Sequence, residues 1–214
     1  MLVHALKLIW NKKRSSSLMI VELVLALGVL FALFAFVSSY VIRFNTPLGF
    51  NVENHWSIEF ASSSDDKAKK AEHVKRLMML MEGLPEVDSA NILMFKPFYD
   101  GNWNTKVVYG DKSVDSLVNI TLENGLKNLG VNLMEGRWFG QEDKALEYTP
   151  VIINLALKQQ LFGNNNAIGE NIQKTTYVID DVAGFEIKLV DYKVVGVMER
   201  FRINGDFTPD SPYM

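Results

Sequence analysis

A long apolar run near the N-terminus constrains this chain more than any other feature. LMIVELVLALGVLFALFAFV, residues 18–37, contains one charged residue, Glu22, and the apolar character continues through Ile42. As a helix rising about 1.5 Å per residue, the run is roughly 30 Å long, which matches the hydrocarbon core of a bilayer. It therefore predicts a transmembrane helix over residues 18–42. A secretory signal peptide is the alternative, although its apolar region is usually shorter.

The charges that flank the run predict its orientation. Residues 1–17 contain basic residues and no acidic one, whereas only Arg43 follows the run closely. The positive-inside rule then places the N-terminus in the cytoplasm and residues 43–214 outside, which is the periplasm in a bacterium with two membranes. Residues 1–17 also have apolar residues at helical spacing, which predicts an amphipathic, basic segment at the inner membrane surface.

Two further features of the predicted span suggest contacts for it. Small residues at helical spacing form one stripe, which would let a second helix approach closely. The stripe consists of Gly28, Ala32, Ala35 and Ser39. Glu22 lies on another face, roughly 120° from the stripe at 100° per residue. A carboxylate in lipid is costly, so its side chain should face protein, water or the headgroup boundary. We interpret it as an intramembrane or interfacial acid.

Residues 43–214 predict one mixed α/β domain. Alternating residues favour strands over 55–62 and 87–95 around a helix over 63–83, which together would form a βαβ layer. The remainder predicts a β-rich subdomain, in which Asn154 caps a helix after a buried strand and two closing strands join around residues 190–192. The predicted fold class is α+β, with one transmembrane helix followed by a mixed α/β periplasmic domain.

The sequence contains no pattern that indicates catalytic chemistry. The absence of cysteine excludes disulfides and thiolate metal sites, and His4, His55 and His73 are scattered. No Walker A loop, nucleophile elbow or dinucleotide fingerprint is present. A net charge of −3 argues against a nucleic-acid-binding surface. We therefore expect no enzyme activity, no catalytic residue, no cofactor and no metal.

Several short elements resemble the MacB/FtsX-like permeases of ABC transporters. GRWF at 136–139 with Asp143 resembles the family's GR-x-F…D element, and PVIIN, LFG, AIG and VVGVMERF follow in the family's order. The residues of these elements are Gly136, Arg137, Phe139, Asp143, Asn154, Phe162, Gly163, Gly169 and Gly196. Glycines of this kind fix turns, so we interpret the set as determinants of the fold rather than of chemistry.

The resemblance implies that residues 43–214 form the periplasmic core domain of an inner-membrane permease. Such a subunit would couple ATP hydrolysis by a separate ATP-binding subunit to periplasmic conformational change or export. It would work as a homodimer or as a heterodimer with another permease. The resemblance implies four membrane spans in a complete member, three of them after the periplasmic domain. We therefore expect the domain in this sequence to be incomplete at its C-terminus. Two other classes stay open: a single-pass membrane protein with a periplasmic binding or sensing module, and a secreted enzyme.

Overall fold

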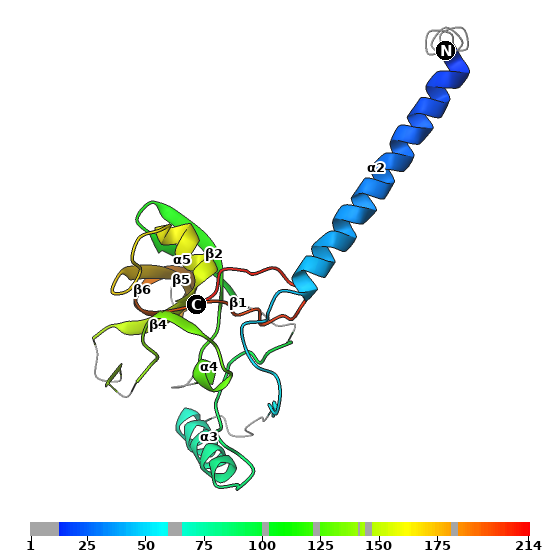
Figure 1. Ribbon diagram of the computed structural model, residues 1–214. Coiled ribbons are helices and arrows are strands. Elements are labelled where there is room, and N and C mark those ends of the chain that lie inside the picture. The colour runs from blue at the N-terminus through cyan, green and yellow to red at the C-terminus, as the bar shows by residue number, and fades with distance from the viewer. Residues whose placement is uncertain are drawn as a thin grey trace. The chain divides into compact units, whose positions relative to one another are not determined.

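Two compact units divide the chain in the computed structural model, Met1–Thr46 and Pro47–Met214. Each is considered by itself below, with the element labels of Figure 1. The structure describes residues 13–59, 66–99, 103–121, 125–140, 142–143, 147–180 and 184–214.

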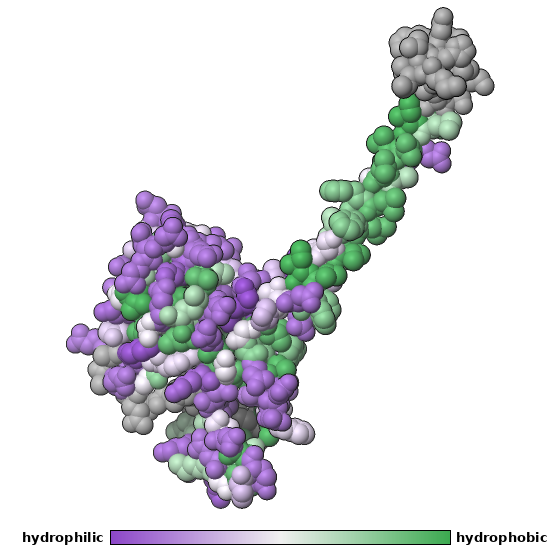
Figure 2. All heavy atoms as spheres, in the orientation of Figure 1, coloured by the Kyte–Doolittle hydropathy of each residue, from purple (hydrophilic) through white to green (hydrophobic). Residues whose placement is uncertain are grey.

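The first unit contains the helix α2 (Lys13–Phe44), and its segment Ser17–Phe44 is long and apolar enough to cross a membrane. Exposed apolar side chains follow one another along this segment, and none of it is buried within the described protein. Figure 2 shows them along the face of α2 that is in view. At the C-terminal end, the Asn45 side chain donates to the Val41 carbonyl at 2.8 Å and Thr46 Oγ1 donates to the Ile42 carbonyl at 2.7 Å. The Val41 carbonyl also accepts from Asn45 N at 3.0 Å, so the two side chains add donors to carbonyls of the last helical turn. The helix predicted over 18–42 is thus observed, with both ends extended.

The second unit is built on a curled, mixed sheet. β1 (Trp103–Tyr109) and β2 (Lys112–Val118) form an antiparallel hairpin, and β5 (Asn171–Asp180) pairs antiparallel with β6 (Gly184–Met198). The described strands follow the order β2-β1-β5-β6-β3, and β4 pairs with β6 off this path. β6 is the hub of the sheet, because it pairs with three other strands.

Two short strands and two helices complete this sheet. β3 (Leu133–Gly136) lies antiparallel to β6, whereas β4 (Thr149–Asn154) lies parallel to it. β4 continues directly into α5 (Leu155–Phe162), and α4 (Gly125–Asn128) precedes β3. A parallel connection places helical chain against the sheet, so the central strands are covered on both faces.

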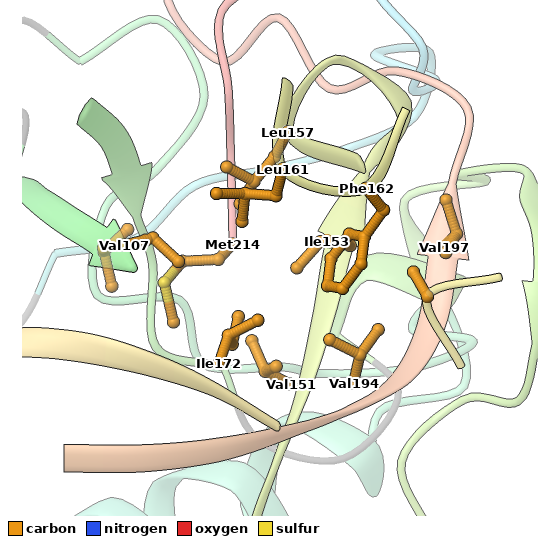
Figure 3. Close-up of a cluster of buried hydrophobic side chains, with 12 residues drawn as sticks. Val107, Val151, Ile153, Leu157, Leu161, Phe162, Ile172, Val194, Val197 and Met214 are labelled. Atoms are coloured by element: carbon orange, nitrogen blue, oxygen red, sulfur yellow. The ribbon is translucent and has the colours of Figure 1, made fainter. Parts of the chain in front are cut away.

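The core consists of two apolar clusters, one on each face of β4 and β6. Val151, Ile153, Val194 and Val197 face the first cluster, which α5 closes from above with Leu157, Leu161 and Phe162 (Figure 3). Ile152, Val195 and Met198 face the second cluster. The alternation along each strand therefore distributes continuous apolar sequence between two cores.

The C-terminal residues belong to the first and second cores as well. Met214 is buried in the first cluster and Tyr213 in the second. The segment lies between β2 and β4, since Met214 N donates to the Leu117 carbonyl at 2.9 Å and Asn154 N donates to the Tyr213 carbonyl at 2.9 Å. This segment thus joins two strands that do not pair with each other directly.

The predicted βαβ layer is the main local departure from expectation. Its helix forms as α3 (Lys67–Glu82), capped by Asp66, whose side chain accepts from Ala68 N. Its strands do not: residues 55–59 are irregular, and the segment 87–95 makes only one bridge, from Leu93 to Thr121. Residues 60–65, which include the end of the first predicted strand and the start of the predicted helix, lie outside the described residues. Alternating residues alone therefore do not make these two segments strands, because within the described chain no neighbouring strand pairs with either of them.

A second departure concerns the closing strands. The expected turn around 190–192 is wrong, because β6 runs unbroken through these residues. Gln173 pairs opposite Asp191, and Gln173 Nε2 donates to Asp191 Oδ1 at 3.0 Å. The long β5 partner keeps β6 extended across a sequence that locally favours a turn. The fold class itself is confirmed, with one apolar helix followed by a mixed α/β domain.

Candidate functional site

The residues predicted on α2 lie on an open helix surface. Gly28, Ala32 and Ala35 are exposed and Ser39 is half-buried, so the stripe is free of other contacts from the described chain at its N-terminal part. A Cβ added at Gly28 would meet no atom within 4 Å. Glu22 is also exposed on this helix. The geometry leaves the stripe available to a second helix without showing one.

Arg137 and Asp143 form the most strongly bonded side-chain pair among the motif residues. Arg137 Nη1 donates to Asp143 Oδ2 at 2.8 Å and Nη2 donates to Oδ1 at 2.5 Å, a bidentate geometry. The same guanidinium donates to the Trp138 carbonyl at 3.0 Å, and Gly140 N donates to Asp143 Oδ2 at 2.8 Å. The pair therefore holds the turn that follows β3 closed.

Electrostatics reinforce this pair. The hydrogen bonds from Arg137 hold the pKa of the Asp143 carboxyl below its ordinary value, against the opposite effect of burial. The same bonds raise the pKa of Arg137. Asp143 has only 7% of its side chain exposed, whereas Arg137 has 40% exposed. A carboxylate so bonded is a structural anion, because three donors of its own turn already bond its two oxygens.

Gly136 and Gly196 meet where β3 crosses β6. They are register partners, and a Cβ at Gly136 would overlap the carbonyl oxygen of Val195. Gly136 also has a φ of +77°, which L side chains rarely adopt. A Cβ at Gly196 would lie 2.7 Å from the carbonyl oxygen of Arg137. Glycine is needed at both positions because the two backbones approach too closely for any side chain.

Asn154 is fully buried, and its side chain makes three hydrogen bonds to two other segments. Its Oδ1 accepts from Leu157 N at 2.9 Å, which caps α5 as predicted, and also from Tyr213 N at 3.0 Å. Its Nδ2 donates to the Ser211 carbonyl at 2.8 Å. One side chain thus fixes the start of α5 and the path of the C-terminal segment.

The remaining motif residues lie around the far end of α5 and the second core. Phe162 is buried, and its ring centroid is 4.3 Å from that of Tyr109. Gly163 ends α5 with a φ of +63°, and Gly169 has a φ of +88°. Phe139 packs against the second core cluster. The motif residues of the second unit therefore lie in or beside β3, β4, β6 and α5, and we name them the frame.

Sequence reasoning missed two buried cations. Lys174 is 6% exposed, with its Nζ 5.3 Å from the Trp103 ring centroid and 5.5 Å from that of Tyr192, and burial lowers its pKa. Arg202 is buried too, and its guanidinium donates to the Thr208 carbonyl at 2.8 Å. Lys174 follows the buried Ile172 by two residues in the same strand. Because residues i and i+2 of a strand lie on one face, this spacing is the signal that would have placed the Lys174 side chain inward.

Metal coordination finds no support in the described part of the chain, where no group of three or more His, Asp or Glu side chains is arranged to hold an ion. The described polar side chains of the frame bond mainly to backbone groups of their own turns and caps. These described side chains are therefore engaged in holding the fold.

Residues 16–213 of the chain match the family described as the MacB-like periplasmic core domain. A search of curated proteins finds no match.

Two solved structures are similar at 16% identity. The extracellular domain of the noncanonic ABC-type transporter YknZ from Gram-positive bacteria has a TM-score of 0.43, with 65% of this chain and 60% of that chain covered. The periplasmic region of MacB from Actinobacillus actinomycetemcomitans has a TM-score of 0.42, with 64% and 51% covered. The chain thus spans little more than half the length of these structures. Because the family match covers nearly all of its residues, the chain belongs to the MacB-like periplasmic core domain family.

Proposed function

We propose that this chain acts as a permease subunit, or as part of one, in a MacB-like ABC transporter. In this proposal α2 crosses the bacterial inner membrane with its N-terminus in the cytoplasm, and residues 43–214 lie in the periplasm. The chain has no catalytic role of its own. It couples ATP hydrolysis by a separate ATP-binding subunit to periplasmic conformational change or export.

The observation that carries this proposal is the junction of two features in one chain. An apolar helix of 28 residues, Ser17–Phe44, and the domain that follows it both lie within residues 16–213, which match the MacB-like periplasmic core domain family. Basic residues precede the helix, which favours a cytoplasmic N-terminus. A periplasmic domain on such a helix can respond to events in the cytoplasm through movement of the helix.

The domain is built to receive such movement. Leu48, four residues after α2 ends, accepts a hydrogen bond from Arg202 N at 2.9 Å. The backbone of Gly49 lies against that of Arg200 so closely that a Cβ there would overlap the Arg200 carbonyl. The ring of Phe50 lies 5.1 Å from that of Phe201, which belongs to the second core. A displacement of the linker would therefore pull on the core after β6 rather than on a loose loop.

Topology can be tested cleanly because the chain has no cysteine. Ser15→Cys and Asn164→Cys each introduce one thiol, and Asn164 is exposed in the loop after α5. We expect a membrane-impermeant maleimide to label Asn164→Cys in cells with a permeabilised outer membrane. Ser15→Cys should react only after the inner membrane is lysed. Labelling of both positions before lysis would contradict the proposed orientation.

Coupling to an ATPase requires a separate test. An epitope-tagged chain is cross-linked in native membranes and purified, and the co-purified proteins are identified by mass spectrometry. We expect a protein with a Walker A loop to be enriched over an untagged control. ATP hydrolysis by that complex should fall when the loop's lysine is substituted. If no ATP-binding protein is enriched, the transporter assignment fails while the topology remains testable by itself.

A further inference from the structure

The strands of the second unit form a closed ring, because residues 211–214 bridge β2 and β4. We name these residues the strap. On one side Tyr213 pairs with Leu117 in a parallel bridge, and on the other side Asn154 N donates to the Tyr213 carbonyl at 2.9 Å. Ladder pairings join β2 to β1, β1 to β5, β5 to β6 and β6 to β4, so the strap completes the circle.

Every member of this ring contributes to the first core cluster, which is therefore the interior of the ring. The contributing strand and strap residues are Val107, Val118, Val151, Ile153, Ile172, Val194, Val197 and Met214. Figure 3 shows the side chain of Met214 in this cluster together with those of the strands. Release of the strap would open the ring between β2 and β4 and would remove Met214 from its interior.

Few backbone bonds hold the strap in its place. On the β2 side, Leu117 N donates to the Pro212 carbonyl at 2.9 Å, Met214 N donates to the Leu117 carbonyl at 2.9 Å, and Asn119 N donates to the Met214 carbonyl at 3.0 Å. On the β4 side, Asn154 bonds the strap through its backbone N and both ends of its amide. By contrast, β5 pairs with β6 along its whole length. The strap is therefore a short link in an otherwise long ladder.

The hairpin of β1 and β2 depends on the strap for its position. On the opposite side of this hairpin, the register pairs between β1 and β5 in the described chain involve only Val107 and Val108. Thr105 Oγ1 adds one bond there, to the Thr175 carbonyl at 2.6 Å. Because both links are short, release of the strap would leave the hairpin joined to the sheet by one short link.

A row of three aromatic rings connects the strap to residues 48–50, the linker that follows α2. The ring centroid of Phe201 lies 5.1 Å from that of Phe50 in the linker and 4.9 Å from that of Tyr213 in the strap. Phe201 and Tyr213 are each 2% exposed, and Phe50 is half-buried. Protein cores are closely packed, so a displaced Phe50 would leave Phe201 without part of the packing that holds it against Tyr213.

We propose that closure of the ring by the strap is coupled to docking of the linker on Phe201, so that displacement of the linker releases the strap. Groups that share a packed neighbour are coupled energetically, and such coupling is reciprocal. The coupling is a property of the second unit alone. Its use to convert movement of α2 into opening of the ring rests on the proposed function.

Hydrogen exchange of the full chain in detergent can follow the closing bonds one amide at a time. The amides of Leu117, Asn119 and Asn154 donate to the strap, and their exchange reports its release. The amides of Gly169 and Val194 donate to carbonyls outside the strap, at 2.8 and 2.9 Å, and serve as references in the same unit. A faster strap relative to these references is the signature of local opening.

Gly49→Ala displaces the linker without removing a side chain. A Cβ at Gly49 would overlap the carbonyl oxygen of Arg200, and the φ of Gly49 is +88°. We expect the three strap amides to exchange about tenfold faster than in the wild type, together with the Arg202 amide that donates to the Leu48 carbonyl. Gly163→Ala is the matched control, because its φ is +63° but a Cβ there would meet no atom within 4 Å. It should leave the strap amides unchanged relative to the references.

Phe50→Leu tests the same coupling through packing instead of backbone overlap. It removes the ring beside Phe201 but keeps an apolar side chain at a half-buried position, so the domain should still fold. We expect the strap amides to exchange faster relative to the references. Phe139→Leu makes the same substitution at another partly buried ring of the second core cluster and should not have this effect.

Three results would overturn the coupling. The first is unchanged exchange of the strap amides in both linker variants, whether or not the Arg202 amide is freed. The second is equal acceleration of the strap and reference amides, which would reveal a general loss of stability. The third is an equal effect of Phe50→Leu and Phe139→Leu, because the whole cluster would then hold the strap. The measurement involves neither a bilayer nor an ATPase, so failure of the coupling and failure of the transporter assignment are distinguishable.

Discussion

Gly136 and Gly169 allow conformational strain to be separated from steric space at single residues. Their φ angles are +77° and +88°, but a Cβ at Gly136 would overlap the Val195 carbonyl while one at Gly169 would meet no atom within 4 Å. Gly169→Ala should cost about 1–2 kcal/mol of unfolding free energy from backbone strain alone. Gly136→Ala should cost clearly more, because β3 must also move away from β6.

Urea unfolding of both variants in detergent, followed by tryptophan fluorescence, measures this difference. Equal losses for the two variants would mean that β3 yields without cost at its crossing with β6. A larger loss at Gly169 would contradict the geometry of both positions.

Asp143 gives a prediction about pH. Its pKa is held below its ordinary value by Arg137, so the pair stabilises the fold above about pH 4, and this stability is lost as the pH falls through the lowered pKa. Asp143→Asn should therefore lower the unfolding free energy by about 1–2 kcal/mol at pH 7. The difference from the wild type should shrink as the pH approaches about 2.

Glu142 supplies a matched control for the same cation. Its carboxylate lies 3.5 Å from Arg137 Nη1 but is 65% exposed, so Glu142→Gln should have little effect at any pH. Unfolding free energies measured across this pH range test both variants. A difference between the wild type and Asp143→Asn that stays constant with pH would show that the pair acts through packing alone.

Among the elements, those with local causes were predictable from the sequence. Asn154 was expected as the cap of α5, and it bonds Leu157 N, because capping depends on residues three positions apart. The hairpin of β1 and β2 also has a local cause, since alternating residues flank the turn at Gly110. In contrast, the length of β6 depends on pairing with β5, and no pattern within residues 184–198 reveals that partner. The Arg137–Asp143 geometry likewise followed only from the folded turn.

For α2, the small-residue stripe predicts helix association. Gly28→Leu with Ala32→Leu should weaken self-association of the chain in a bilayer, because the larger side chains keep the helices apart. Ala26→Leu makes a similar change about 160° around the helix from Gly28 and should leave association unchanged. Energy transfer between labelled chains in vesicles measures the effect. Equal association of all variants would exclude the stripe as the contact.

At the scale of the whole molecule, stability should be unevenly distributed. Residues 151–154 of β4 and 194–198 of β6 are buried, whereas α3 has only half-buried apolar residues along one side and exposed Met79 and Leu80. The sequence predicted one strand before α3 and one after it, and these two strands would have covered the half-buried face of the helix. Their amphipathic patterning could not show whether strand partners exist, since pairing is a property of the whole sheet.

Hydrogen exchange provides the last prediction. Amides of α3 should exchange through local opening, because few apolar contacts oppose fraying of this helix, whereas amides of β4 and of β6 residues 194–198 should exchange only with global unfolding. α5 is the matched control, since it is half the length of α3 but packs Leu157, Leu161 and Phe162 into the first core. If exchange is governed by helix length, α5 will open before α3. If burial governs it, as we expect, α3 will open first, and protection of α3 equal to that of β4 would reveal that a partner covers its apolar side.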